Sequence, residues 1–251
     1  MKQTLALAAI LAVLIAGQVS SRAQSAAAAT PPPPVQPPVV LDRVVGVING
    51  DVLLESDVKE EQRFAALEPF SVPPGTDTLK RASRRLANRT LILQQMKEQQ
   101  IGITVSEDEV RQALTDLRTH LPKCRQAHCS TDEGWKTFLA ANNLTEDEVF
   151  AHWKQRLAIL KFIDLRFRSG IRIPNEEIEA YYQKSILPVY ERQKEAPPPL
   201  KEISPRIQEI LLQQQVNELL RDWLRSLRDE GSVQILDPAY GDSSGKPSEE
   251  D

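Results

Sequence analysis

The sequence predicts a mainly α-helical fold, with a small sheet formed by strands from the N-terminal and C-terminal ends of the helical core. Three observations support this prediction. Apolar residues recur at helical spacing over most of residues 55–230. Short β-branched runs stand at both ends of that region. The 251 residues include only 10 Gly and 5% aromatic residues, which is atypical of β-barrels and of enzymes with Gly-rich nucleotide loops.

Two predicted strands open the folded region and a third closes it. Residues 44–48 are β-branched, and the Asn49-Gly50 pair after them is a strong turn signal, so residues 52–54 are expected to complete a hairpin. Residues 233–236 form the third strand. Because unpaired strand edges are unfavourable when buried, we expect strand 233–236 to pair with strand 44–48.

Helix starts are predicted from capping residues. Ser56 is the expected N-cap of a helix that runs to about residue 67. Ser106 and Thr145 each begin a capping box, with a glutamate three residues later. Further helices are expected over residues 78–100, around residues 135–139, and after Pro174.

The last helix is expected to begin at Ser204-Pro205 and to end at Gly231. Proline is favoured in the first turn of a helix, where its missing N–H has no partner to lose. Glycine is favoured just past the last turn.

Both flanks of the chain are predicted to lie outside the fold. Residues 1–23 have the pattern of a secretory signal peptide, with Lys2, an apolar run shorter than a membrane span, and cleavage expected after Ala23. Residues 24–41 are predicted to be a Pro-rich disordered linker. Residues 237–251 are predicted to be an acidic disordered tail, which leaves residues 42–236 as the folded domain.

Cys124 and Cys129 are close in sequence, in a predicted loop after Pro122. In an oxidising compartment this spacing predicts a disulfide. The alternatives are two free thiols, or a zinc site in which His120 and His128 join the two cysteines, since two nitrogen and two sulfur ligands suit zinc.

Charged clusters have structural interpretations as well as functional ones. The acids at 107–109, 146–148 and 176–177 stand in first helical turns, where capping and the helix dipole favour them, so catalytic carboxylates are not expected. The arginines at 81, 84, 85 and 89 are expected to form a solvated helix face, or to meet acidic partners.

Aromatic side chains on the helices are the candidates for binding another protein. At helical spacing such residues either fill the core or line a groove for a client polypeptide. The candidate client-binding residues are Trp135, Phe138, Trp153, Phe162 and Phe167.

Several segments, in order, resemble the SurA-type periplasmic chaperones, the SurA N-terminal domain family that also resembles PrsA and trigger factor. Residues 41–58, LDRVVGVINGDVLLESDV, are similar to the opening of that family. Residues 101–110 and 171–182 resemble its later helix boundaries, and residues 212–215, 223–228 and 233–235 resemble its C-terminal helix and strand. The resemblance covers most of residues 42–236.

One departure from the family pattern affects the predicted function. The family places one or two parvulin prolyl-isomerase domains where this chain has only a short loop, residues 182–204. The resemblance therefore implies the chaperone fold without isomerase activity, no enzyme activity and no cofactor.

The expected function is an ATP-independent chaperone of the periplasm that binds unfolded or nascent outer-membrane or secreted proteins. Transient proximity to a membrane is compatible with this role. The formal net charge of −4 does not favour nucleic acid as a partner, and oligomeric state is left open. Two other classes are considered, a degenerate peptidyl-prolyl cis-trans isomerase and a structural envelope protein.

Overall fold

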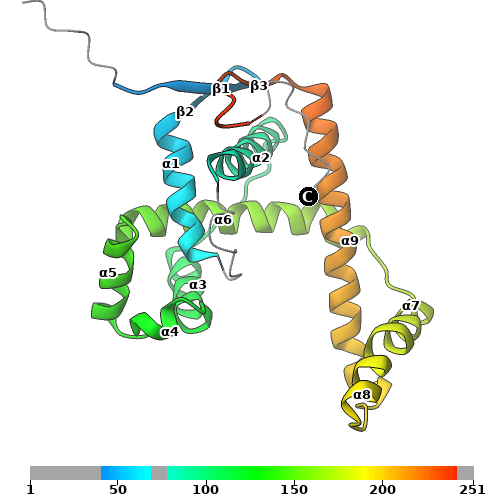
Figure 1. Cartoon of the computed structure of the whole chain (residues 1–251). Helices are drawn as coiled ribbons and strands as arrows, with labels where there is room; N and C mark the ends of the chain where they lie inside the picture. The colour runs from blue at the N-terminus through cyan, green and yellow to red at the C-terminus, as the bar shows by residue number, and fades with distance from the viewer. Residues whose placement is uncertain (1–40, 69–77, 242–251) are drawn as a thin grey trace, which may run out of the picture. The chain divides into compact units, whose positions relative to one another are not determined.

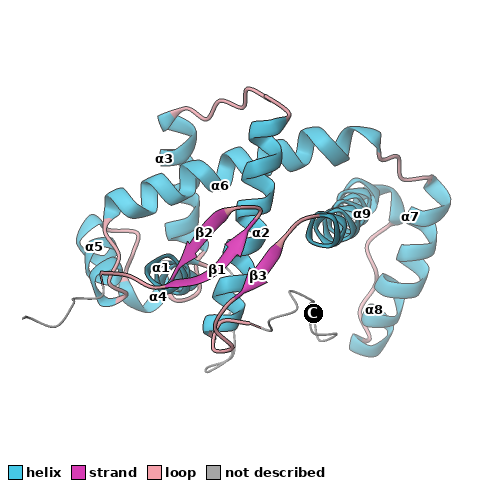
Figure 2. Ribbon diagram, turned by 90° about the horizontal axis from the view of Figure 1, so that it is seen from above, coloured by secondary structure: helices cyan, strands magenta, loops and turns pink. Residues whose placement is uncertain are grey.

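Strands from the two ends of the described chain form one small sheet (Figures 1 and 2). The computed structural model describes residues 41–68 and 78–241. Strands β1 (Val44–Ile48), β2 (Asp51–Leu54) and β3 (Val233–Ile235) are antiparallel, in the order β2-β1-β3. Ile48 lies opposite Val233, so the predicted pairing of the first and last strands is confirmed, as is the mainly helical fold class.

Two local features make this strand arrangement possible. Asn49 and Gly50 both have positive φ, as the tight turn between β1 and β2 requires. The Asn49 side chain also accepts a hydrogen bond from the Ser232 amide at 2.7 Å, which ties the turn to the chain entering β3. In β1, a Cβ atom on Gly46 would lie 2.9 Å from the Gln234 carbonyl oxygen, so only glycine allows this approach of β3.

Long helices form the body beneath the sheet. Helix α1 (Glu55–Phe64) follows β2 directly and ends in a short 3₁₀ turn (Ala65–Leu67). Helix α2 (Leu79–Glu98) packs under the sheet, and α6 (Glu146–Phe167) crosses below α2 (Figure 1). Helix α9 (Leu200–Glu230) contacts both α2 and α6 and leads into β3.

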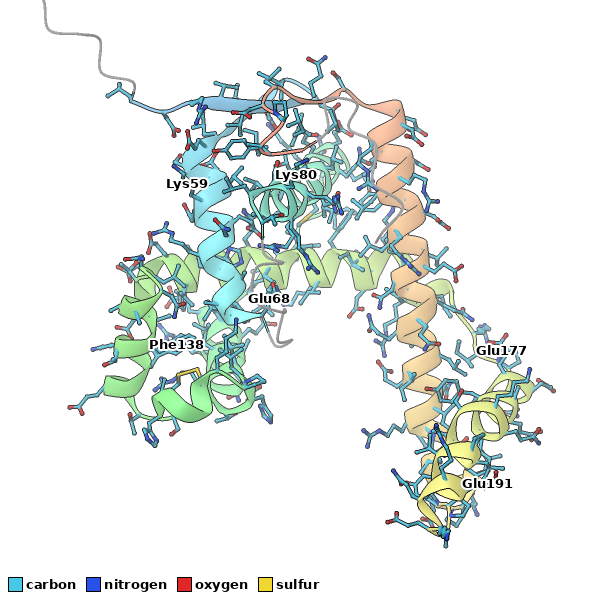
Figure 3. All side chains as sticks on the ribbon, viewed as in Figure 1. Lys59, Glu68, Lys80, Phe138, Glu177 and Glu191 are labelled. Carbon is cyan, nitrogen blue, oxygen red and sulfur yellow. A yellow bond between two sulfur atoms is a disulfide. The ribbon has the colours of Figure 1, made fainter. Side chains whose placement is uncertain are left out.

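A second group of helices packs against α6 around its own apolar core. It consists of α3 (Glu107–His120), the single turn α4 (Cys124–Ala127) and α5 (Asp132–Ala141). We call this group the disulfide lobe, because the structure joins Cys124 to Cys129 within it, and Figure 3 shows the bond.

The predicted short loop of residues 182–204 is largely helical instead. After a 3₁₀ turn (Arg168–Gly170), α7 (Asn175–Tyr181) continues into a π-helical turn (Tyr182–Ile186) and α8 (Leu187–Gln193). These elements lie beside the N-terminal half of α9, and the Tyr182 hydroxyl donates a hydrogen bond to the Pro198 carbonyl at 2.8 Å. The segment is thus a compact helical arm on α9.

Helix caps agree with the sequence at most positions. The capping boxes at Ser106 and Thr145 are both present. Ser56 is not a cap, however, because α1 begins two residues earlier than expected, at Glu55, with Leu54 in the N-cap position. The Ser56 hydroxyl donates instead to Asp42, while Asp57 accepts the hydrogen bond from the Leu54 amide.

Two predicted boundaries near the C-terminal end are also wrong. Helix α9 begins at Leu200, so Pro205 lies inside the helix rather than in its first turn. The predicted tail from residue 237 begins too early, because Tyr240 is only 3% exposed and packs in the core beneath the sheet. Residues 242–251, the predicted signal peptide 1–23 and nearly all of the linker 24–41 lie outside the described residues.

Candidate functional site

A groove of about 380 Å³ opens where α1, α2, α6 and α9 meet. Its lining combines charged, amide and aliphatic side chains from helices that are far apart in sequence. These residues are Glu61, Glu68, Arg85, Asn88, Arg89, Ile92, His152, Arg156, Ile159, Leu160 and Leu220.

The floor of the groove is an ion-paired carboxylate. Glu61 of α1 is only 6% exposed. One of its oxygens lies 3.1 Å from Arg85 Nε and the other 2.6 Å from Arg89 Nη1, both from α2. A buried carboxylate is stable only when such partners offset its loss of hydration. The pairs therefore hold α1 and α2 in a fixed arrangement.

His152 of α6 lies beside this ion pair as a neutral ring. It stacks on Phe64 with ring centroids 3.8 Å apart. Burial, reinforced by the charges of Arg89 and Arg156, lowers the pKa of His152 to about 3. Its Nδ1 atom lies 3.4 Å from Arg89 Nη1, and because a guanidinium only donates hydrogen bonds, Nδ1 is the acceptor.

A second ion pair connects α6 to the end of the α1 segment. Arg156 donates to Glu68 at 3.1 Å, and its guanidinium lies 5.2 Å from the centroid of the Trp153 ring. Glu68 is labelled in Figure 3, at the end of the chain segment that follows α1. Both charges line the groove, so its polar side remains accessible.

Aliphatic side chains also line the groove. Ile92, Ile159 and Leu220 line it, and Leu160 is 49% exposed at its rim. Leu220 also lines an adjacent hollow on α9, together with Asn217 and Arg221. An extended polypeptide would find apolar contacts and hydrogen-bond donors side by side here, which suits segments of mixed composition.

The predicted aromatic candidates do not form this groove. Trp135, Phe138 and Trp153 are buried in the core of the disulfide lobe and α6. Phe162 is fully buried between α6 and α9. Phe167 alone of the five is partly exposed. The first four are core residues, so the expectation that they line a client surface is corrected.

Phe167 belongs to a junction between α6 and α9. Its ring meets Trp223 edge-on with centroids 5.6 Å apart. The Arg166 guanidinium lies over the Trp223 ring at 4.6 Å. These contacts fix the crossing of the two helices and give Phe167 a structural role.

The structure does not assemble the alternative zinc site. Cys124 and Cys129 are joined to each other, with Cα atoms 5.1 Å apart. The ring of His120 contacts the Asp116 carbonyl oxygen at 2.7 Å. Within residues 41–68 and 78–241, no group of three or more His, Cys, Asp or Glu side chains is arranged to hold a metal ion.

The structure confirms the predicted capping role of acidic residues but not the predicted solvated face of the arginines on α2. Glu109 and Glu148 act as capping residues, and hydrogen bonds from Lys161 and Thr145, respectively, hold the pKa of each below its usual range. Arg85 and Arg89 are not a solvated face, because they bind Glu61. Sequence reasoning missed Glu61 and His152, since no local pattern indicates which polar helix residue turns inward.

Comparison with known proteins gives one informative similarity. The chaperone SurA of Pseudomonas syringae pv. tomato (strain ATCC BAA-871 / DC3000) is 27% identical over 145 residues, which is 56% of this chain. The aligned part is 32% of that protein, so this chain matches about a third of its length. No family model matches the chain. The similarity supports a SurA-like relationship.

Among the described residues, no helix is both long enough and apolar enough to cross a membrane.

Proposed function

We propose that this protein is an ATP-independent chaperone of the cell envelope that binds unfolded outer-membrane or secreted proteins. The observation that carries the proposal is the groove between α1, α2, α6 and α9, which combines aliphatic residues with guanidinium and amide donors. The SurA-like relationship supports the same role.

The groove would bind an extended client segment through two kinds of contact. Leu160, Ile159 and Leu220 cover apolar client side chains, which are the groups that drive aggregation. Asn88 and Arg156 donate hydrogen bonds to client carbonyl groups. The client leaves when it folds, because folding buries the same apolar side chains and removes its unpaired strand edges. No nucleotide is needed for this cycle.

We further propose that the protein does not catalyse prolyl isomerisation. The family that it resembles carries its isomerase domains between the helices that correspond to α7 and α9. Here this interval holds the helical arm, whose π-helical turn and α8 together span only 182–193. So short a segment cannot enclose a prolyl peptide.

A periplasmic location completes the proposal. The N-terminal sequence has the pattern of a signal peptide. The disulfide suits an oxidising compartment, where such bonds persist.

The test compares two exposed leucines of the same helix. Leu160 lines the groove, whereas Leu165 of α6 is 60% exposed and is not among the groove residues. Leu160→Ser removes apolar contact with the client, so binding of a denatured outer-membrane barrel protein should weaken about fivefold, equivalent to about 1 kcal/mol. Leu165→Ser should bind like the wild type.

Aggregation of the denatured barrel protein is followed by light scattering at stoichiometric chaperone, and affinity by fluorescence anisotropy. Circular dichroism verifies that both variants are folded. Failure of the wild type to suppress aggregation at any ratio would refute the chaperone function, and equal weakening by both substitutions would refute the groove. Turnover in a proline-isomerisation assay would refute the absence of isomerase activity.

A further inference from the structure

The turn between β1 and β2 places an asparagine where segments distant in sequence meet. Asn49 and Gly50 form this turn, with φ of 49° and 92°. The Asn49 amide donates to the Ser232 carbonyl at 2.8 Å, and Asn49 Oδ1 accepts from the Ser232 amide at 2.7 Å. Asn49 Nδ2 donates to Gln94 Oε1 of α2 at 2.9 Å. One side chain therefore connects the turn both to α2 and to the chain that enters β3, which Figure 2 shows beside β1.

The directions of these hydrogen bonds are fixed by their outer partners. Gln94 Nε2 donates to the Ile48 carbonyl at 3.0 Å and to Asp51 Oδ2 at 2.8 Å. A carbonyl and a carboxylate only accept hydrogen bonds, so Gln94 must turn its NH₂ group to them and its Oε1 atom to Asn49. Asn49 must then present Nδ2 to Gln94 and Oδ1 to the Ser232 N–H. We call these five residues the Asn49 network. An amide at position 49 satisfies both neighbours, and a carboxylate does not.

The Asn49-Gly50 pair also has a reaction of its own. An asparagine before glycine readily reacts with its own main chain, because glycine has no Cβ atom to obstruct the approach. The Gly50 nitrogen attacks Asn49 Cγ and forms a C–N bond. The bond between Cγ and Nδ2 breaks, and Nδ2 leaves as ammonia with the proton from Gly50. Water then opens the cyclic imide at either carbonyl, which gives aspartate or isoaspartate at position 49. Solvent water is the co-reactant, and Asn49 is exposed to solvent.

The closed sheet hinders this reaction. Cyclisation carries Asn49 Cγ to its own main chain, so Oδ1 must leave the Ser232 amide and Nδ2 must leave Gln94. The site is also closely packed, because a Cβ atom added to Gly231 after α9 would lie 2.6 Å from Asn49 Oδ1. The contacts with Ser232 and Gly231 exist only while the chain entering β3 lies against the turn. Asn49 is therefore held in the folded chain and released when β3 separates from β1.

The products of the reaction do not fit the Asn49 network. Aspartate at position 49 brings a carboxylate oxygen to Gln94 Oε1, where two acceptors then face each other without a proton between them. If Gln94 turned its NH₂ group toward position 49, its Oε1 atom would face the Ile48 carbonyl and the Asp51 carboxylate instead. Isoaspartate lengthens the main chain by one carbon in a two-residue turn whose length sets the register of the hairpin. Each product therefore weakens the attachment of β3 to β1.

We propose that Asn49 is a site of spontaneous deamidation, that the pairing of β3 with β1 protects it, and that the deamidated product weakens that same pairing. A chain in which β3 stays open is thereby modified, and a modified chain closes less readily. The proposal does not depend on client binding, so its failure and the failure of the proposed function are separate results.

Peptide mass spectrometry tests the protection. Trypsin releases residues 44–59, in which Asn49 is the only asparagine and no glutamine occurs, so a mass gain from deamidation in this peptide identifies Asn49. The whole chain is incubated at mildly alkaline pH in water labelled with heavy oxygen, which separates this reaction from deamidation during digestion. Conversion should be about tenfold faster in urea, where β3 is unpaired. Equal rates with and without urea, or no conversion in urea, would overturn the proposal.

A variant opens the sheet without altering the Asn-Gly sequence. In Gly46→Ala the added Cβ would lie 2.9 Å from the Gln234 carbonyl oxygen, which separates β3 from β1. Conversion of Asn49 without urea should rise about fivefold in this variant. Gly102→Ala, whose added methyl group meets nothing within 4 Å, should convert like the wild type. An unchanged rate in Gly46→Ala would overturn the protection by β3 pairing.

Hydrogen exchange measures the effect of the product. Asn49→Asp should speed the exchange of the Ser232 amide, and of the Leu236 amide that donates to the Val45 carbonyl, about tenfold. Asn143→Asp is the matched control, because Asn143 is exposed and also has positive φ, at 54°. This control should leave the exchange of both amides unchanged.

A second substitution tests the assignment of donors and acceptors. The lysine ammonium only donates hydrogen bonds, so in Asn49→Asp with Gln94→Lys it can serve the new carboxylate, the Ile48 carbonyl and Asp51 together. Slow exchange of the Ser232 amide should return in this double variant, which a merely loosened turn would not show. Exchange in Asn49→Asp equal to that of the wild type, or no recovery in the double variant, would overturn the proposed effect of the product.

Discussion

Glu61 shows how one buried charge organises the junction of α1 and α2. It stands in a polar stretch of sequence, yet its carboxylate is buried and meets two arginines one helical turn apart. Because the Arg85 and Arg89 side chains reach it from α2, the ion pairs connect α1 to α2. All three residues also line the groove.

Glu61→Gln should destabilise the fold by about 1–3 kcal/mol, since it removes a buried anion that two partly buried guanidinium groups contact. Glu107→Gln is the matched control. It breaks an ion pair with Arg111 in which both side chains are more than half exposed, and such pairs contribute about 0–1 kcal/mol. Urea unfolding measures the free energy of unfolding of both variants. Equal effects of the two substitutions would contradict the structural role assigned to Glu61.

Residues whose role depends on neighbours in sequence could be predicted, and residues whose role depends on distant neighbours could not. Ser106 and Thr145 cap helices because the glutamate that completes each box is three residues away. Ser56 is a favoured N-cap residue type, but Lys59 and not a glutamate stands three residues after it. Its hydroxyl donates to Asp42, and β2 runs straight into α1. Glu61 and His152 face inward because of α2, which local sequence does not reveal.

At the scale of elements, α3 and α5 of the disulfide lobe are joined by a very short segment that contains α4. Helix α4 is a single turn, and the chain reverses at His128, which has positive φ. Arg118 of α3 donates to the Cys129 carbonyl at 2.7 Å and pairs with Asp132 at the start of α5. The disulfide and these hydrogen bonds together hold α3 against α5.

The cysteines should be oxidised to each other in the exported protein, which mass spectrometry without reductant would show as a loss of two hydrogens. Replacing both by serine should lower stability by about 2 kcal/mol, because a loop this short gains little from closure. Hydrogen exchange of the α3 and α5 amides, compared between the wild type and the variant, measures the loss of stability of the lobe. Two free thiols, or stoichiometric zinc, in the isolated protein would disprove this assignment.

The helix boundaries around α9 show why an element is harder to delimit than to detect. Apolar periodicity indicates that a long helix ends at Gly231, where α9 does end. Its start lies beside the helical arm: Pro199 occupies the N-cap position of α9, and the neighbouring Pro198 carbonyl accepts a hydrogen bond from Tyr182. Pro205 lies inside the helix, where it cannot donate a hydrogen bond to the Lys201 carbonyl and its ring crowds that carbonyl.

At the scale of the whole molecule, the sheet joins the first and last elements of the fold. Val45, Ile48 and Leu53 share one core with residues of α2, with Tyr240 and with the partly buried Leu227 of α9. The pairing of the strands was predictable, because strand 233–236 had no other predicted partner and the hairpin left one edge of strand 44–48 unpaired. The helical arm and the burial of Tyr240 in the core beneath the sheet were not predictable, since both depend on tertiary packing and not on the apolar periodicity of the sequence.

The substitution Gly46→Ala tests the pairing of β3 with β1. Its Cβ would lie 2.9 Å from the Gln234 carbonyl oxygen, a backbone atom that moves only if β3 separates from β1. We expect a loss of about 1–3 kcal/mol. Gly102→Ala is the control, because nothing lies within 4 Å of its added methyl group. Chemical unfolding compares them, and a Gly46→Ala protein as stable as the control would contradict the close packing of β3 on β1.

The pairing of Ile48 with Val233 also determines the order in which the protein can fold. A chain that emerges from a membrane channel with its N-terminus first exposes β1 long before β3. Closing a loop of about 185 residues costs about 4–5 kcal/mol of chain entropy, and no part of that is recovered until the last strand is free. During the proposed export the protein would therefore present an unclosed β-hairpin edge, and in that interval it would be as prone to aggregate as the polypeptides that it is proposed to protect.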